Sequence, residues 1–194
     1  MQQLVIATNN QGKLKELQAL LPNYRVLTLH DIGFNSEIPE PYETFRENAA
    51  NKAKTVFAFC RIPTISDDSG ICVRSLNGAP GVHSAMFGGE PRSDMKNNQK
   101  LLESLKGRSD RSAYYQAVIC LVTEDGERYF EGTCNGTIAE RPEGTGGFGY
   151  DPLFIPEGYD QTFGVLPPEV KKNLSHRAQA VNKLIEYLDQ GEKK

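Results

Sequence analysis

A short apolar run followed by a helical pattern opens the chain, and the same alternation returns further on. Residues 4–8 are typical of a buried strand, and leucines at helical spacing follow as far as Pro22. Thr44 and Glu47 have the spacing of a capping box that opens a helix to about Cys60. Alternation of this kind predicts an α/β fold with a mixed sheet and flanking helices.

The middle of the chain is richer in strand patterns. Residues 112–123 and 128–137 are joined through Asp125-Gly126, the turn signal of a hairpin. Shorter strands are expected at residues 25–28, 62–66 and 71–74, the last two separated by a tight turn at residues 67–70. Ser93 and Ser175 are expected to begin two further helices. We expect one domain over residues 1–194, with the 112–137 hairpin in a second lobe.

Charge and apolar content exclude several classes of protein. A net charge of −3 over 194 residues argues against a general binder of nucleic acid or anionic membranes. No apolar run approaches the ~20 residues that span a bilayer, and the first residues lack signal-peptide character. Four widely spaced cysteines stand among apolar neighbours, which favours small buried side chains over a disulfide or a catalytic thiol. The expected location is the cytoplasm.

Residues 8–13 form the first candidate site. They lie where a strand ends and a helix begins, a junction that presents backbone N–H groups and a positive dipole end to an anion. Thr8 and Asn10 add hydrogen bonds and Lys13 adds a charge. An ordinary capped helix with an exposed lysine would carry the same residues.

Asp67 and Asp68 form the second candidate site, directly after a predicted strand. Ligands of open α/β sheets bind outside the carboxyl ends of strands. Adjacent carboxylates point in different directions, so one can serve structure and the other a metal or water. Mg²⁺ prefers one or two carboxylates together with phosphate oxygens, and Glu40 is a candidate second ligand. An acidic turn and a surface acid are the plainer interpretations.

Two further segments complete the set. Residues 144–152 form a glycine-rich loop that carries Phe148 and Tyr150, either of which can stack on a flat ligand. A structural turn would have the same composition. His176 and Arg177 fall in the first turn of the last helix, where cations are unfavourable unless an anion or acceptor lies close. A solvated basic turn is the alternative.

Together these motifs resemble the inosine triphosphate pyrophosphatases, also called dITP/XTP pyrophosphatases, in their bacterial-type branch. The matching segments, in family order, are residues 8–13, Glu40, residues 66–70, residues 78–82, residues 144–152 and residues 175–177. The resemblance implies an elongated, two-lobed α/β architecture with a central cleft, and a homodimer. It also implies hydrolysis of ITP, dITP and XTP to monophosphate and pyrophosphate, with Mg²⁺ as cofactor and a purine nucleoside triphosphate as substrate.

The resemblance also implies roles for individual residues. Asp68 is expected to be the proton acceptor and, with Glu40, a metal ligand. The expected substrate contacts are Thr8, Asn9, Asn10, Gln11, Gly12, Lys13, Ser69, Phe148, Gly149, Tyr150, Asp151, Lys171, His176 and Arg177. Met86 departs from the family pattern, because relatives usually carry a basic residue there.

Other functions remain open at this stage. A nucleotide sensor would bind the same ligand without releasing pyrophosphate. A pyrophosphatase for another nucleotide, such as a modified pyrimidine, would share the phosphate chemistry. A nucleic-acid module would need a basic surface and steep salt dependence, which the net charge of −3 disfavours.

Overall fold

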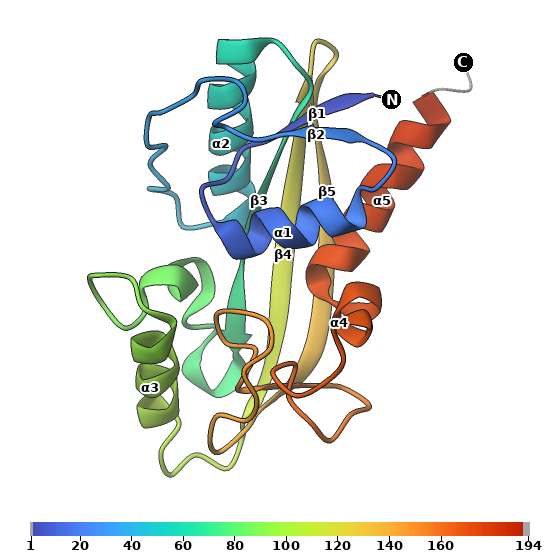
Figure 1. Cartoon of the computed structure of the whole chain (residues 1–194). Coiled ribbons are helices and arrows are strands. Elements are labelled where there is room, and N and C mark those ends of the chain that lie inside the picture. The colour runs from blue at the N-terminus through green and yellow to red at the C-terminus, as the bar shows by residue number, and fades with distance from the viewer. Residues whose placement is uncertain (1, 192–194) are drawn as a thin grey trace. The chain divides into compact units, whose positions relative to one another are not determined.

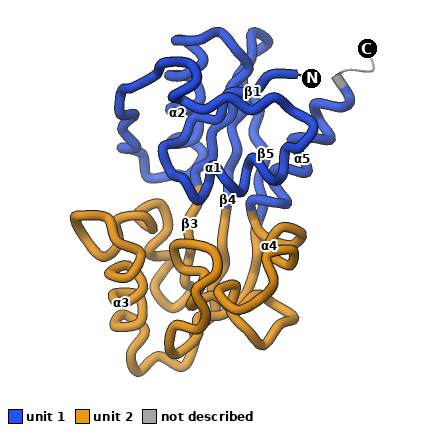
Figure 2. The backbone as a smooth tube through the Cα atoms, in the orientation of Figure 1, with its two compact units in different colours: residues 1–68, 117–132, 177–194 blue, residues 69–116, 133–176 orange. Residues whose placement is uncertain are grey.

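A computed structural model describes residues 2–191, and the chain divides into two compact units (Figure 2). Unit 1 comprises the described residues up to Asp68, Ala117–Gly132 and those from Arg177 onward. Unit 2 comprises Ser69–Gln116 and Thr133–His176.

The elements follow the expected α/β alternation (Figure 1). The strands are β1 (Gln3–Ile6), β2 (Arg25–Leu27), β3 (Thr64–Val73), β4 (Ser112–Thr123), β5 (Gly126–Ile138) and β6 (Phe154–Pro156). The helices are α1 (Gln11–Leu20), α2 (Phe45–Cys60), α3 (Asp94–Ser104), α4 (Pro168–Leu174) and α5 (His176–Gly191), with 3-10 turns η1 (Arg74–Leu76) and η2 (Gly81–Met86). The strand order is β2-β1-β3-β4-β5-β6. β1 pairs in parallel with β2 and β3, and β6 runs antiparallel to β5, which confirms the mixed sheet.

Local capping signals place the helix starts. Asn10 accepts hydrogen bonds from the backbone N–H groups of Gly12 and Lys13 and caps α1. The Thr44 hydroxyl oxygen accepts from the N–H of Glu47 and caps α2. Each side chain satisfies donors that the first helical turn leaves without a partner. These helix starts are therefore confirmed.

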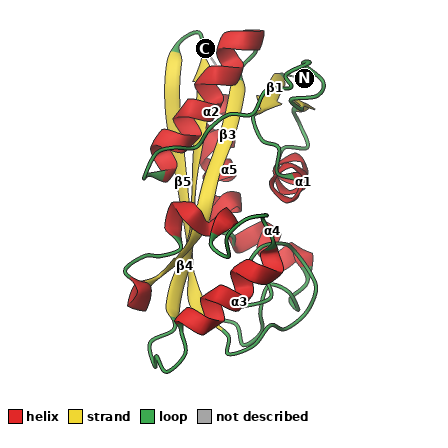
Figure 3. Cartoon of the chain, turned by 90° about the vertical axis from the view of Figure 1, so that its left-hand side faces the viewer, coloured by secondary structure: helices red, strands yellow, loops and turns green. Residues whose placement is uncertain are grey.

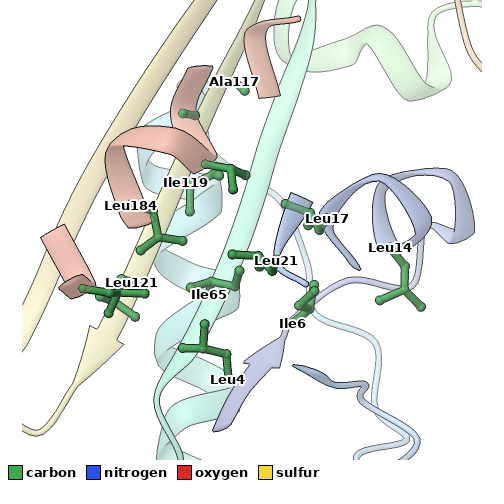
Figure 4. Packing of buried hydrophobic residues seen from close by; sticks show 13 residues of the cluster. Leu4, Ile6, Leu14, Leu17, Leu21, Ile65, Ala117, Ile119, Leu121 and Leu184 are labelled. Atoms are coloured by element: carbon green, nitrogen blue, oxygen red, sulfur yellow. The ribbon is translucent and has the colours of Figure 1, made fainter. Parts of the chain in front are cut away.

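Alternating side chains of β1 face two separate apolar clusters in unit 1. Leu4 and Ile6 belong to the cluster that also contains Ile65 of β3, Leu17 of α1 and Leu184 of α5 (Figure 4). Val5 and Ala7 belong to the other cluster, together with Val56 of α2. Because side chains alternate along a strand, α1 and α5 cover one face of this part of the sheet and α2 covers the other.

Unit 2 has its own core. Ile71 and Val73 of β3 pack there with Leu101 of α3 and with the aromatic residues Tyr115, Tyr150, Phe154 and Phe163. Around α3 and α4 much of the chain is loop and turn (Figure 3). This core supports the glycine-rich loop that the sequence singles out.

One expectation about the elements is wrong, and the structure shows two features beyond the expected elements. The tight turn expected at residues 67–70 is wrong, because β3 runs without a break from Thr64 to Val73. Asp67 and Asp68 therefore lie in mid-strand, where long-range ion pairs outweigh the local turn preference. The hairpin at 112–137 is divided, with residues 117–132 in unit 1 and the rest in unit 2. α4 and β6 are additional elements that the sequence pattern did not indicate.

The cysteine side chains agree with the expectation of small buried residues. All four cysteines are free thiols, with Cys72, Cys120 and Cys134 buried and Cys60 partly buried. Burial raises the pKa of Cys120 and of Cys134 to about 12, which suits packing and not nucleophilic chemistry. Within residues 2–191, no helix combines the length and apolar character needed to cross a bilayer.

Candidate active site

A cluster of charged side chains surrounds the middle of β3 in unit 1. We call it the charged cluster; its members are Lys13, Glu16, Glu40, Lys52, Asp67, Asp68 and Arg177. Asp67 and Asp68 are neighbours on a strand, so their side chains leave opposite faces of the sheet. The partners of Asp67 come mainly from α1 and α5, and α2 supplies Lys52 beside Asp68.

Asp67 is a fully buried carboxylate held by two cations. One of its oxygens, Oδ2, accepts from Arg177 Nη2 at 2.9 Å and Nε at 3.2 Å, and lies 3.2 Å from Lys13 Nζ. The guanidinium of Arg177, also buried, makes a further ion pair with Glu16. Arg177, a cation in the first turn of α5, therefore finds its anionic partners, Asp67 and Glu16, within the protein itself.

Asp68 has a different environment. Its Oδ1 lies 3.4 Å from Lys52 Nζ and 3.9 Å from Lys13 Nζ. The same Lys52 ammonium donates to Glu40 Oε2 and, at 3.0 Å, to the backbone carbonyl of Asp67. Asp68 Oδ2 is buried and has no hydrogen-bond partner among the described residues. Lys52 thus bridges two carboxylates, one of which retains an unused acceptor oxygen.

These environments push the pKa values of the two aspartates apart. Burial alone would raise the pKa of Asp67, but Arg177 and Lys13 hold it well below its ordinary value of 3.8. Burial raises the pKa of Asp68 to about 6, against the opposing charges of Lys52 and Lys13. Divergent pKa values in neighbouring carboxyls separate a permanent anion from a titratable group. Asp67 is the structural anion, and Asp68 is the carboxyl able to exchange a proton near neutral pH.

The amino end of α1 lies beside this cluster through Lys13. Asn10 occupies the N–H groups of Gly12 and Lys13, and Thr8 Oγ1 accepts the N–H of Asn10 at 3.1 Å. Part of the donor set expected for an anion is therefore already satisfied by the cap. What α1 offers an anion is its dipole and the Lys13 ammonium.

The residues present fit a hard divalent cation. No three His, Cys, Asp or Glu side chains within residues 2–191 gather so as to hold a metal by themselves. Glu40 and Asp68 instead meet at one cation, Lys52, and Asp68 Oδ2 is a buried acceptor without a partner. Two carboxylates completed by phosphate oxygens and water are a donor set that suits Mg²⁺.

In unit 2, Asp151 organises the glycine-rich loop. This buried carboxylate accepts the N–H of Phe148 at 2.8 Å, the Lys171 ammonium of α4, and the Tyr115 hydroxyl at 3.4 Å. Gly147 has a φ of +72°, and a Cβ there would lie 2.0 Å from Asp151 Oδ2. The loop therefore closes tightly over its own carboxylate.

The aromatic residues of unit 2 have distinct surroundings. Phe148 is partly exposed, and the Lys171 ammonium lies 4.8 Å from its ring centroid. Tyr150 is buried in the core, where its hydroxyl donates to the carbonyl of Ser84. Of the two aromatic candidates for stacking, Phe148 is the one that is partly exposed. His176 is also buried, stacked on Tyr115 with ring centroids 4.6 Å apart.

The predicted site residues thus fall into two groups. In unit 1 the structure brings together Lys13, Glu40, Asp68 and Arg177, with Thr8 and Asn10 at the neighbouring helix start. In unit 2 it brings together Phe148, Gly149, Tyr150, Asp151 and Lys171. Asn9 and Gln11 are exposed and Gly12 and Ser69 partly exposed. Met86 is exposed on η2, and nothing in the structure explains its departure from the family pattern.

Lys52 was missed by the sequence analysis. It stands four residues from Asn48 and from Val56, on the stripe of α2 that is buried. A lysine at that position of a largely apolar stripe must meet a counter-charge, because an unpaired buried cation is costly. That pattern is the signal that would have found it.

Comparisons with known proteins place the chain. Residues 4–187 match the Ham1 family model. A "dITP/XTP pyrophosphatase" of Bacillus licheniformis is 43% identical over 195 residues, covering 98% of this chain and 100% of the relative. A protein of the same name from Nitrosomonas europaea is 44% identical over 197 residues, covering 99% and 97%.

Solved structures agree with the sequence relatives. The Staphylococcus aureus Ham1 protein superposes with a TM-score of 0.89 at 38% identity, covering 98% of this chain and 100% of that one. The Coxiella burnetii HAM1 protein gives a TM-score of 0.89 at 36% identity, with the same coverage. The family resemblance drawn from the motifs is confirmed: this chain belongs to the Ham1 family.

Proposed function

We propose that this protein hydrolyses dITP, XTP and ITP to the monophosphate and pyrophosphate, and so removes deaminated purines from the nucleotide pool. The observation that carries the proposal is the bridge of Glu40 and Asp68 through Lys52, with Lys13 beside it. The names of the relatives support the substrate class.

The charged cluster has the components needed to hold a triphosphate. In the free protein the Lys13 ammonium pairs with both Asp67 and Asp68. We propose that it also donates hydrogen bonds to phosphate oxygens when the substrate binds. The positive end of the α1 dipole acts in the same direction. Arg177 keeps its ion pairs with Asp67 and Glu16, and so links β3, α1 and α5.

Glu40 and Asp68 would hold Mg²⁺. The metal, when bound, supplies charge neutralisation to the phosphates. Lys52 contacts both carboxylates in the free protein, so it keeps two anions together before the metal arrives. Burial alone would lower the pKa of Lys52, but Asp68 and Glu40 raise it above its ordinary value, and the ammonium stays charged.

Asp68 is the residue we propose to orient the attacking water and to receive its proton. Its pKa of about 6 in the free protein leaves most of the carboxyl ionised at pH 7. Asp67 is unsuited to this step, because Arg177 and Lys13 hold its pKa too low for it to accept a proton near neutral pH. Phosphoryl transfer depends chiefly on positioning and charge compensation, which the remaining members of the cluster supply.

Base recognition is assigned to the glycine-rich loop of unit 2. Hypoxanthine and xanthine present a keto acceptor at C6, where adenine presents an amino donor. Backbone N–H groups of the loop match the acceptor, apart from those of Phe148 and Gly149, which already donate to Asp151 and Asp94. A mismatched donor costs about 1–3 kcal/mol, or roughly 5- to 150-fold. The ring of Phe148 adds stacking that does not depend on the base.

A substrate panel tests this function. ITP, dITP, XTP, GTP, ATP and dUTP are incubated with and without Mg²⁺, and monophosphate, pyrophosphate and orthophosphate are measured separately. We expect pyrophosphate from the deaminated purines only, and only with the metal. Equal rates on ATP and ITP would contradict the proposal, and binding without turnover would indicate a nucleotide sensor. A preference for dUTP would place the protein among pyrimidine pyrophosphatases.

Asp68→Asn is the matched variant for the same assay. It keeps the shape of the side chain but removes the charge and the proton-accepting oxygen. We expect kcat to fall at least about 100-fold, the usual range for loss of a general base. Activity within a few-fold of the unaltered protein would remove Asp68 from its proposed role.

The proposal extends to assembly and location. We propose a homodimer acting in the cytoplasm, as the family resemblance implies. Sedimentation equilibrium of the purified chain measures the assembly directly, and a monomeric mass at micromolar concentration would contradict it.

A further inference from the structure

Two side chains of α3 hold the peptide groups on either side of Gly149. Asp94 Oδ2 accepts the N–H of Gly149 at 2.7 Å. Asn98 Nδ2 donates to the carbonyl of Gly149 at 3.0 Å. Asp94 and Asn98 are four residues apart and therefore lie on one face of the helix. All three residues belong to unit 2.

Packing alone does not explain the conformation of Gly149. Its φ of +63° lies in the left-handed region, and a Cβ there would meet nothing within 4 Å. A close neighbour in place of a side chain therefore does not explain the glycine conformation, and the hydrogen bonds from α3 hold the backbone at this point. Asp151 fixes the N–H of Phe148, so side chains hold three backbone polar groups of Phe148 and Gly149.

The neighbouring residue of α3 holds a second loop. Asn97, which is buried, accepts the N–H of Gly88 at 2.6 Å and donates to the carbonyl of Ala85 at 3.0 Å. α3 thus brackets the loop after η2 through Asn97 and the glycine-rich loop through Asp94 and Asn98.

We propose that Asp94 and Asn98 are positioning residues for base selection, which act by fixing the Gly149 backbone. The inference rests on the proposed function, because it assigns base recognition to the same loop. Neither residue needs to touch the substrate. The two hydrogen bonds occupy the N–H and C=O of Gly149 and fix the backbone there, so the neighbouring loop residues are oriented before the base arrives.

We call the hydrogen bonds from Asp94 and Asn98 to Gly149 the clamp. Removing either bond should affect substrate binding and base selection more than the chemical step. The charged cluster lies in unit 1 and keeps its own contacts. We expect Asp94→Ala and Asn98→Ala to raise KM for dITP about 10-fold, with kcat within about 3-fold. We also expect the preference for dITP over dATP to fall at least about 5-fold, since a mobile loop accommodates the adenine amino group.

Two matched variants separate positioning from general loss of stability. Asp94→Asn keeps an acceptor oxygen for the Gly149 N–H and should restore most of the selectivity. Ser93→Ala removes the α3 cap, whose hydroxyl oxygen accepts the N–H of Lys96, and weakens the helix without touching the clamp. It should lower Tm and leave the dITP-to-dATP ratio unchanged.

Amide exchange of Gly149, followed by NMR without substrate, provides a readout independent of activity. We expect at least 10-fold faster exchange in Asp94→Ala and near-normal exchange in Asp94→Asn and Ser93→Ala. Unchanged exchange and unchanged selectivity in both alanine variants would overturn the inference. Loss of selectivity in Ser93→Ala to the same degree would also overturn it, because helix stability would then be the cause.

The same experiment distinguishes failure of the clamp from failure of the proposed function. An unaltered protein that does not hydrolyse dITP would overturn the proposed function and the role in base selection together. If the unaltered protein is active but the alanine variants keep its base selectivity and its Gly149 amide exchange, only the role of Asp94 and Asn98 is overturned. If Asn98→Ala does not fold, the comparison of Asp94→Ala with Asp94→Asn decides the matter.

Discussion

Replacing Asp67 with asparagine should destabilise the protein strongly while changing its shape very little. The carboxylate is fully buried and shares Oδ2 between Arg177, at 2.9 Å, and Lys13, at 3.2 Å. Asp67→Asn removes the negative charge and leaves a buried guanidinium with Glu16 as its remaining anion. The expected damage therefore comes from uncompensated charge and not from a cavity.

The magnitude follows from the burial of both partners. Breaking a buried ion pair by removing one partner costs about 3–5 kcal/mol. Natural proteins of this kind have a free energy of unfolding of about 5–15 kcal/mol. Each kcal/mol shifts Tm by about 2–4 °C at this chain length, so Tm should fall by about 6–20 °C.

Urea unfolding at pH 7 measures the effect, with Glu124→Gln as the control. Glu124 pairs with Arg61 at 3.7 Å on the surface, and the two side chains are 73% and 68% exposed. The same charge-to-amide change there should cost at most about 1 kcal/mol. If Asp67→Asn loses no more stability than Glu124→Gln, the assignment of Asp67 as a structural anion is wrong.

The pH dependence of folding stability tests the same assignment of Asp67. The folded pKa of Asp67 is depressed, so its stabilisation is fully present above the unfolded value of about 3.8. It is lost as the pH falls through the folded pKa, because the carboxyl is then neutral. The gap in stability between the unaltered protein and Asp67→Asn should therefore narrow progressively below about pH 4.

Three further predictions concern the proposed site. Mg²⁺ affinity, measured by calorimetry, should fall about 10-fold per pH unit below pH 6, because Asp68 with its pKa of about 6 must release a proton; Asp68→Asn should lack this dependence. Lys52→Met should move the acid limb of the kcat/KM profile to higher pH, since it removes a cation that lowers the pKa of Asp68; an unmoved limb would count against the bridge. Gly147→Ala should raise KM for dITP more than Gly149→Ala does, because both have positive φ but only the former places a Cβ against Asp151. Equal effects would contradict the packing argument.

Local chemistry explains which elements were predictable from the sequence. The helix starts at Thr44 and Ser93 depend on hydrogen bonds within three residues, and both were predicted correctly. The cap at Asn10 is equally local and lies within residues 8–13, where a helix was expected to begin. The Asp125-Gly126 turn is equally local, and the hairpin it joins is present. Signals of this range can be read from neighbouring residues alone.

Long-range contacts explain what the sequence did not show. Asp-Asp-Ser-Gly has strong turn preferences, yet β3 continues through it because Arg177, 110 residues away from Asp67, compensates the buried charge. The position of Lys52 on the buried stripe of α2 indicates that it needs a counter-charge, but the partners Glu40 and Asp68 lie outside that helix. The Asp94–Gly149 hydrogen bond joins residues that are 55 positions apart, and the sequence around either residue gives no signal for it.

The sequence predicted which residues belong to the site, but not how they interact with one another. Lys13, Glu40 and Asp68 were selected by residue type and order, and the structure places them in one cluster. The residues alone predicted that one aspartate serves structure and the other a metal or water, but not which. The pKa values of Asp67 and Asp68 depend on burial and on cations from three helices.

The proposed reaction is tested most directly by hydrolysing dITP in water enriched in ¹⁸O. Attack on the α-phosphorus predicts one labelled oxygen in the dIMP and none in the pyrophosphate. Label in pyrophosphate or orthophosphate, or no turnover of dITP with Mg²⁺ present, would contradict hydrolysis of the bond between the α and β phosphates by this protein.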